Sequence, residues 1–182
     1  MRFPFDTFVV VDLPPHVVQQ VRGIRKAYGS ARQFLPVEIT VAGSSGVGIF
    51  DATQDADTAL LTLERLAGEI APFPMELTGV TRFPGTGVFY YDIKDTAPLF
   101  AIHERIKASG LQFQPSPFPF SPHLTIDTFD EASDDLVKEL LALPLPQSPF
   151  QVEGMSAYSL NGWDCRVVKS CRLGTTRQIR PT

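Results

Sequence analysis

Cysteine, histidine and tryptophan are scarce in this 182-residue chain, which contains two, three and one of them. Cys165 and Cys171 lie in a segment that is predicted to form one strand. Six extended residues cover roughly 20 Å, which is beyond the reach of a disulfide. No further cysteine or histidine pair lies nearby in the sequence to complete a zinc site. We therefore expect free thiols, a cytoplasmic location, and neither a metal ion nor another cofactor.

Long apolar runs and an excess of positive charge are also missing. The first apolar run, residues 8–11, stops at Asp12, and no later run is long enough to cross a bilayer. The formal net charge is −4, which argues against a broad basic surface for duplex DNA or RNA. A small phosphate-bearing ligand stays compatible with this charge, because a pocket needs only a few local donors. We expect no membrane partner and no duplex DNA partner.

The chain contains 14 Phe and 16 Pro residues, and its order of elements repeats after about eighty residues. Residues 7–12 and 87–92 each read as a strand that ends in Asp. A proline-containing turn and an amphipathic helix follow in both cases. The two helices stop at Gly29 and Gly110, where a left-handed residue is favoured. The recurrence predicts an internal duplication.

Each half continues with a short alternating strand, a Phe-Asp pair, a second helix and a closing strand. The order is therefore β-α-β-α-β, twice. We expect an α+β fold with two lobes, residues 7–84 and 87–160, and a final strand at 164–173. The lobes should be related by a pseudo-two-fold axis, with two antiparallel sheets lining a central cleft and helices outside. Residues 1–182 would then form one bilobal, monomeric domain.

The short strand of each half alternates between apolar and polar side chains, which sorts them onto two faces. In the first, Glu38 and Thr40 share the polar face. In the second, His123 and Thr125 do so. If the apolar faces pack under the helices, the two polar faces meet across the cleft. These four residues are the candidate site.

Paired His-x-Thr/Ser-x motifs on related strands of duplicated β-α-β-α-β halves are typical of the 2H phosphoesterase superfamily. With Glu38-x-Thr40 and His123-x-Thr125 at such positions, this chain resembles that superfamily, and in particular its 2′-5′ RNA ligase and cyclic phosphodiesterase branch. The likeness extends from Phe8 to Leu173. It implies metal-independent acid–base chemistry in which two histidines flank the phosphate of a 2′,3′-cyclic or 2′-5′-linked nucleotide. His123 would be one acid/base, because imidazole titrates near neutral pH. Thr40 and Thr125 would donate hydrogen bonds to the phosphate.

Glu38 departs from this pattern, because the resemblance implies a histidine at its position. Three interpretations stay open. Glu38 could carry a proton if burial or the phosphate keeps its carboxyl protonated. Catalysis could instead be lost, leaving a module that binds a nucleotide or an RNA terminus with a cyclic phosphate. Finally, the true site could lie elsewhere. Whether the chain is an enzyme is thus left open by its sequence.

Weaker signals add candidate contacts for the base or the phosphate. Arg82 ends a strand beside a turn and could supply a cation. Tyr90 and Tyr91 follow one another on a strand, so one of them should face the cleft and could stack on a base. His16 and His103 fall on predicted helices, and we interpret both as ordinary helix residues.

Overall fold

The computed structural model describes residues 2–175, and it contains four α-helices, one 3₁₀-helix and eleven strands. The strands of the first half are β1 (Asp6–Val11), β2 (Ile39–Ala42), β3 (Ile49–Phe50), β4 (Phe73–Met75) and β5 (Leu77–Arg82). Those of the second half are β6 (Val88–Ile93), β7 (Phe113–Gln114), β8 (Leu124–Thr128), β9 (Phe150–Val152), β10 (Gly154–Asn161) and β11 (Asp164–Arg172). The helices are α1 (Pro15–Ala27), η1 (Ala31–Phe34), α2 (Ala56–Glu69), α3 (Ala97–Lys107) and α4 (Asp134–Leu141).

The predicted duplication of elements is visible in the helices that follow β1 and β6. Both α1 and α3 bury an apolar stripe, which includes Val17 and Val21 in the first and Leu99 and Ile106 in the second. Both lead to a glycine in the left-handed region, Gly29 with φ of 65° and Gly110 with φ of 84°. Because a side chain at positive φ would be strained, the two glycines end these helices where the sequence indicates.

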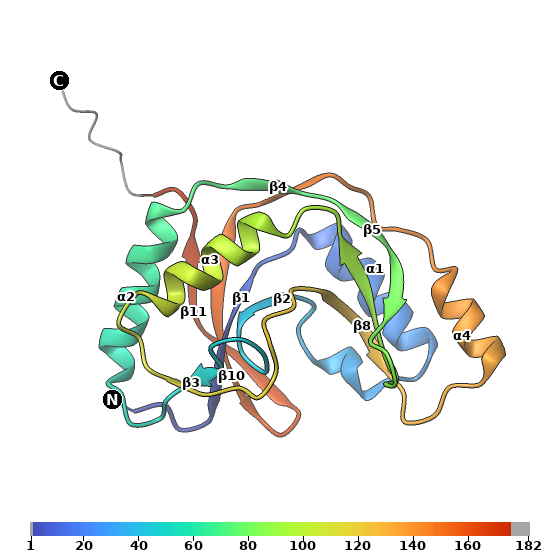
Figure 1. The fold of residues 1–182 in the computed structure, drawn as a ribbon, viewed down its shortest axis with the longest axis horizontal. Coiled ribbons are helices and arrows are strands. Elements are labelled where there is room, and N and C mark those ends of the chain that lie inside the picture. Colours follow the sequence, from blue (N-terminus) through green and yellow to red (C-terminus); the bar gives the residue numbers. More distant parts are fainter. Residues whose placement is uncertain (1, 176–182) are drawn as a thin grey trace.

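Two antiparallel sheets form the framework, and each takes strands from both sequence halves (Figure 1). The larger has the order β11-β10-β1-β2, and the smaller has the order β5-β6-β8. Strand β10 of the second half pairs with β1, whereas β5 of the first half pairs with β6. The α+β fold with antiparallel sheets is therefore confirmed. Each sheet thus combines strands from both of the expected lobes, residues 7–84 and 87–160, because the closing strands β5 and β10 are exchanged between them.

The exchange begins where each closing segment breaks into two strands. Strand β4 pairs with β9 in a separate two-stranded ribbon. After it the two segments enter different sheets, the first at Glu76, which leads into β5, and the second at Glu153, which leads into β10. The helices follow the same pattern, since α1 packs on β8 and α3 packs on β2. Helix α2 packs on β11, and helix α4 packs on β5. Each sheet is thus held by elements of both halves.

The core lies between the sheets and these helices, and it contains Val41, Leu63, Tyr91 and Ile126 among its buried residues. Cys165 and Cys171 both lie on β11 and are free thiols, as expected. No helix within residues 2–175 is long and apolar enough to span a membrane.

Candidate active site

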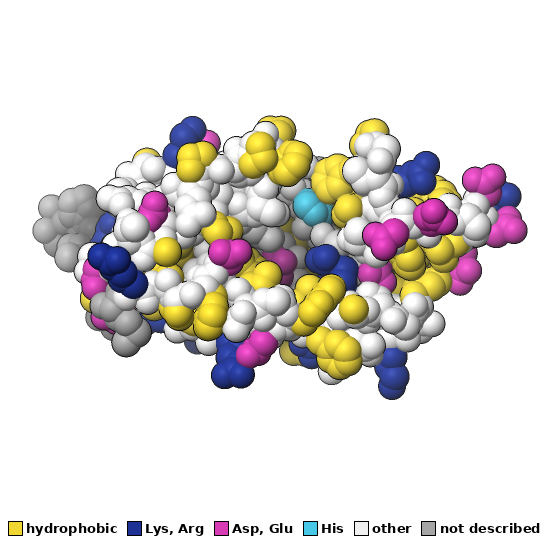
Figure 2. All heavy atoms as spheres, turned by 90° about the horizontal axis from the view of Figure 1, so that it is seen from below, with side chains coloured by type: hydrophobic (Ala, Val, Ile, Leu, Met, Phe, Trp, Pro, Cys, Tyr) yellow, Lys and Arg dark blue, Asp and Glu magenta, His cyan; other side chains and the backbone are white. Residues whose placement is uncertain are grey.

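A cleft of about 320 Å³ lies between the two sheets. Figure 2 shows this side of the molecule, where the surface is hollowed and acidic, basic and histidine side chains gather at the hollow. Its lining comes from β1, β2, β3 and β8, from the segments that precede β2 and β8, from the loop between β2 and β3, and from β10 and β11. The polar lining residues are Asp6, Arg32, Glu38, Thr40, Ser44, Ser45, Ser121, His123, Thr125 and Cys165. Both sequence halves therefore supply polar groups to one cavity.

The predicted alternation of the two motif strands is present in the structure. In β2, Ile39 and Val41 are buried, whereas Thr40 is half-buried and reaches the cleft. In β8, Leu124 and Ile126 are buried, and Thr125 reaches the cleft. Period-two geometry thus turns both threonines away from the core.

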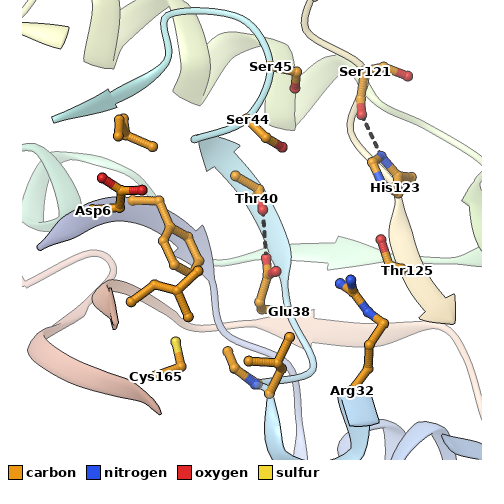
Figure 3. Close-up of a pocket in the computed structure, with 15 residues that line it drawn as sticks. Asp6, Arg32, Glu38, Thr40, Ser44, Ser45, Ser121, His123, Thr125 and Cys165 are labelled. Atoms are coloured by element: carbon orange, nitrogen blue, oxygen red, sulfur yellow. Dashed lines mark hydrogen bonds between the residues drawn. The ribbon is translucent and has the colours of Figure 1, made fainter. Parts of the chain in front are cut away.

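Glu38 and His123 each lie one residue before a strand, Glu38 before β2 and His123 before β8. Glu38 and Thr40 project from the β2 side of the cleft, and His123 and Thr125 project from the β8 side (Figure 3). The structure therefore brings together the four residues that the sequence singled out.

Burial dominates the chemistry of Glu38. Loss of solvent raises the pKa of its carboxyl from about 4.5 to about 7. Three weaker influences act in the opposite direction: a hydrogen bond from the Thr40 hydroxyl to Glu38 Oε2 at 3.0 Å, and the charges of Arg25 and Arg32. The net result is a carboxyl that is protonated in an appreciable fraction of molecules at neutral pH.

His123 is held in a neutral, oriented state. Burial lowers the pKa of its imidazole, a hydrogen bond to the Ser121 carbonyl opposes this, and the nearby charge of Arg32 lowers it further. That hydrogen bond joins Nδ1 to the Ser121 oxygen at 2.7 Å. Because Nδ1 donates to a carbonyl, the proton of the neutral ring sits on Nδ1 and Nε2 stays an acceptor. Phe83 and Tyr90 pack on the ring at centroid distances of 4.9 Å and 5.0 Å.

Arg25 of α1 fixes the spacing between the two sides of the cleft. Its guanidinium is buried, and it donates to two carbonyls of β8, those of Thr125 at 2.8 Å and Ile126 at 2.8 Å. It also donates at 3.1 to 3.2 Å to three carbonyls that precede β2, those of Arg32, Leu35 and Pro36. The Arg25 side chain therefore links β8 to the segment that precedes β2.

Arg32 of η1 is a cleft residue that sequence reasoning missed. Its side chain extends toward the space between Glu38 and Thr125 (Figure 3). Arg82, the cation that the sequence suggested, is exposed at the end of β5 and does not line the cleft. The sequence offered no signal for Arg32, because it lies in a short 3₁₀ turn outside the repeated strands and helices.

The remaining candidates divide between the cleft rim and the core. Tyr90 packs beside His123, but Tyr91 is fully buried and its hydroxyl donates to the Pro144 carbonyl at 2.7 Å. The proposed ligand contact of Tyr91 is therefore corrected, because its side chain is part of the core. Tyr90 is half-buried and contacts the His123 ring, but it is not itself among the residues that line the cleft.

The two other histidines lie outside the cleft, and the one cysteine that lines it is not an acid or base at neutral pH. His16 is exposed on α1, and His103 is buried on α3, where Nδ1 hydrogen-bonds to the Val41 carbonyl at 2.8 Å. Cys165 lines the cleft, but burial and the charges of Glu38 and Asp164 raise the pKa of its thiol to about 11, so it stays uncharged. Within residues 2–175, no cluster of three or more metal-ligating His, Cys, Asp or Glu side chains is present.

This geometry defines a class of protein: a two-sheet cleft that presents a carboxyl and an imidazole from matched strands, with hydroxyls and one arginine beside them. Comparison with known proteins identifies the family. The profile of the 2′-5′ RNA ligase superfamily matches residues 13–162. The chain therefore belongs to the 2′-5′ RNA ligase superfamily, whose members share the 2H phosphoesterase fold.

Individual relatives agree with this placement. A protein of Geobacillus kaustophilus that is provisionally named a phosphoesterase is 29% identical over 120 residues, which are 64% of this chain and 66% of the relative. Escherichia coli LigT complexed with 3′-AMP is 20% identical, with a TM-score of 0.59, over 93% of this chain and 98% of LigT. The protein TT0787 of Thermus thermophilus is 20% identical, with a TM-score of 0.58, over 94% of this chain and all of TT0787. These two structures show the shared fold.

Proposed function

We propose that this protein hydrolyses a 2′,3′-cyclic or 2′-5′ nucleotide phosphodiester in the cleft, with Glu38 and His123 as the acid–base pair. The ligand would be a nucleotide or an RNA terminus that carries such a phosphate. LigT structures that contain 3′-AMP, NADP⁺ and ATP support a nucleotide as the ligand class. We expect the protein to act as a monomer in the cytoplasm.

The observation that carries this proposal is the pair of opposed pKa shifts in one cavity. Burial raises the pKa of Glu38 to about 7 and lowers that of His123. At neutral pH the imidazole is therefore ready to accept a proton, and a protonated Glu38 is available to donate one. A pair of titratable groups whose environments favour opposite protonation states is suited to divide the acid and base roles.

The step follows from these states. His123 Nε2 accepts a proton from water, whose oxygen forms a bond to phosphorus. The bond between phosphorus and one ribose oxygen breaks, and Glu38 donates its proton to that oxygen. The product is a phosphate monoester and a free hydroxyl. Thr40 and Thr125 would donate to the non-bridging oxygens, where negative charge increases in the transition state. A neutral Glu38 also avoids repelling the phosphate.

One observation favours a second candidate, a module that binds nucleotides without turnover. The Thr40 hydroxyl donates to Glu38 Oε2 at 3.0 Å instead of pointing to a ligand. Catalysis through Thr40 requires this hydrogen bond to be exchanged for one to the phosphate. If the exchange does not occur, Glu38 and Thr40 form a self-contained pair, and only binding is left.

Hydrolysis of 2′,3′-cyclic AMP by purified protein tests the proposal, with ³¹P NMR as the readout. We expect wild-type protein to release a phosphate monoester. Glu38→Gln keeps the shape and the ability to accept from Thr40 but cannot supply a proton, so its rate should fall by about 10²- to 10⁴-fold. Glu38→His should restore the turnover that Glu38→Gln loses. His123→Ala should abolish turnover.

Two substitutions serve as matched controls. Glu131→Gln and His16→Ala change the same residue types at exposed positions outside the cleft, and both should leave the rate unchanged. Binding of 3′-AMP without any turnover would support the second candidate. Full activity of Glu38→Gln would exclude Glu38 as the acid.

A further inference from the structure

We propose that Arg32 is the cation that binds the phosphate group of the ligand in this cleft. The inference rests on the proposed function, because it assigns a phosphate to the cavity. It goes further by naming a binding residue that lies outside the motif strands and that the sequence did not suggest.

The first argument is that the guanidinium has no hydrogen-bond or ion-pair partner within residues 2–175. Arg32 Nε is buried and has no hydrogen-bond partner in the part of the chain that the structure describes. Among the described residues, no carboxylate lies within 4.0 Å of its guanidinium, although it lines the same cavity as Glu38. Buried donors are rarely left unpaired, because each costs about 1–3 kcal/mol. An arginine in this state is suited to an anion that completes its hydrogen bonds.

The second argument is the way in which the backbone of Arg32 is held. Its carbonyl accepts from Arg25 Nη1 at 3.1 Å, and its amide donates to Ser30 Oγ at 3.0 Å. Ser30 Oγ in turn donates to Asp127 Oδ1 at 2.7 Å, and Asp127 lies on β8. Arg25 also holds the Thr125 carbonyl at 2.8 Å. Arg32 is therefore fixed to β8, the strand that presents Thr125, before any ligand enters.

The third argument is the charge of the lining. Asp6 and Glu38 are the acidic residues of the described lining, and Arg32 is its one lysine or arginine. A phosphodiester that enters this cavity meets a single permanent positive charge. A guanidinium can form two parallel hydrogen bonds with phosphate oxygens, and such charge-assisted bonds are about twice as strong as neutral ones. Arg32 is thus the cleft group best suited to balance the charge of a phosphate.

Arg32 also has a simpler interpretation, in which it serves as a counter-ion of Glu38. Its charge does lower the pKa of Glu38, but burial has the larger effect and raises that pKa to about 7. A carboxyl that is protonated in much of the population at neutral pH needs no permanent counter-ion. The two interpretations differ in what Arg32 recognises, so ligands with and without a phosphate separate them.

Isothermal titration calorimetry at pH 7 with 3′-AMP, inorganic phosphate and adenosine provides the test. Arg32→Gln should weaken binding of 3′-AMP by about 10- to 100-fold, as expected for the loss of a charged hydrogen-bonding partner. Its affinity for adenosine should stay that of the wild type. Arg32→Lys keeps the charge but loses the bidentate geometry, so its affinity for 3′-AMP should be intermediate. Arg82→Gln, an exposed arginine outside the cleft, should bind as the wild type does.

The outcomes separate this inference from the proposed hydrolysis. Arg32-dependent binding of 3′-AMP by a protein without turnover would support the phosphate role of Arg32 and contradict the catalytic proposal. Turnover by the wild type together with unchanged 3′-AMP binding by Arg32→Gln would overturn the role of Arg32 alone. An equal loss of 3′-AMP and adenosine affinity in Arg32→Gln would also overturn it. Absence of 3′-AMP and phosphate binding by the wild type would overturn the role of Arg32, and it would contradict the proposed hydrolysis as well only if 2′,3′-cyclic AMP were also not turned over.

Discussion

Glu38→Gln should stabilise this protein at alkaline pH and leave its stability unchanged at acidic pH. The carboxyl of Glu38 has an ordinary pKa near 4.5 in the unfolded chain and a pKa of about 7 in the folded protein. Below the unfolded pKa both states are protonated, so ionisation contributes nothing. Between the two values the folded state binds more protons, and the free energy of unfolding falls as the pH rises. Above the folded pKa the loss is complete.

The shift sets the magnitude of this effect. One pKa unit corresponds to about 1.36 kcal/mol, so the rise of Glu38 to about 7 costs the ionised wild type about 3 kcal/mol. Glutamine has no charge to desolvate, and its amide oxygen can still accept from Thr40. For a domain of this size, about 3 kcal/mol corresponds to a rise in Tm of about 6–12 °C.

Urea unfolding at pH 4 and pH 8.5, followed by circular dichroism, measures the difference. We expect Glu38→Gln to exceed the wild type by about 3 kcal/mol at pH 8.5 and to match it at pH 4. Glu131→Gln, which changes an exposed glutamate, should match the wild type at both. A Glu38→Gln variant that gains nothing between these pH values would refute the burial argument for Glu38.

Three further predictions follow from the same contacts. Arg25→Met should destabilise the fold by about 3–5 kcal/mol in urea unfolding, because it leaves the five carbonyls that accept from Arg25 without their partner; an unchanged midpoint would contradict the role of Arg25. Thr125→Val, which removes a cleft hydroxyl, should lower kcat by about 10²-fold while the Tm changes little, and an unchanged kcat would remove Thr125 from the site. Gly46→Ala should lower the Tm, because Gly46 has φ of 69° and an added Cβ would lie 2.2 Å from His103 Cε1; a variant as stable as the wild type would contradict the tight packing of this loop on α3.

The local structure of both motif strands could be predicted from the sequence because it depends on a period of two. The alternation of Ile39, Thr40 and Val41, and of Leu124, Thr125 and Ile126, decides which side chains can be buried. The same reasoning placed Tyr90 and Tyr91 on opposite faces of their strand without indicating which of the two is buried. Glycine at positive φ likewise fixed the ends of α1 and α3, since Gly29 and Gly110 are each required there by backbone geometry.

Long-range pairing could not be predicted in this way. Strands β5 and β10 have the same alternation whichever sheet they join, so the exchange between halves depends on the packing of the whole chain. Arg25 and Arg32 illustrate the same limit. In the sequence they are two of several basic residues near the end of a helix, and only the folded chain shows that one is buried against carbonyls while the other reaches the cleft.

The pH dependence of kcat/KM for 2′,3′-cyclic AMP tests most directly whether Glu38 and His123 act as an acid–base pair. We predict a bell-shaped profile. Its acidic limb should lie below pH 6.5, where the imidazole of His123 becomes protonated, and its alkaline limb near pH 7, where Glu38 loses its proton. The Glu38→Gln variant should show low residual activity without the alkaline limb. A profile that is flat from pH 5 to pH 8, or an alkaline limb near pH 7 that persists in Glu38→Gln, would contradict the account.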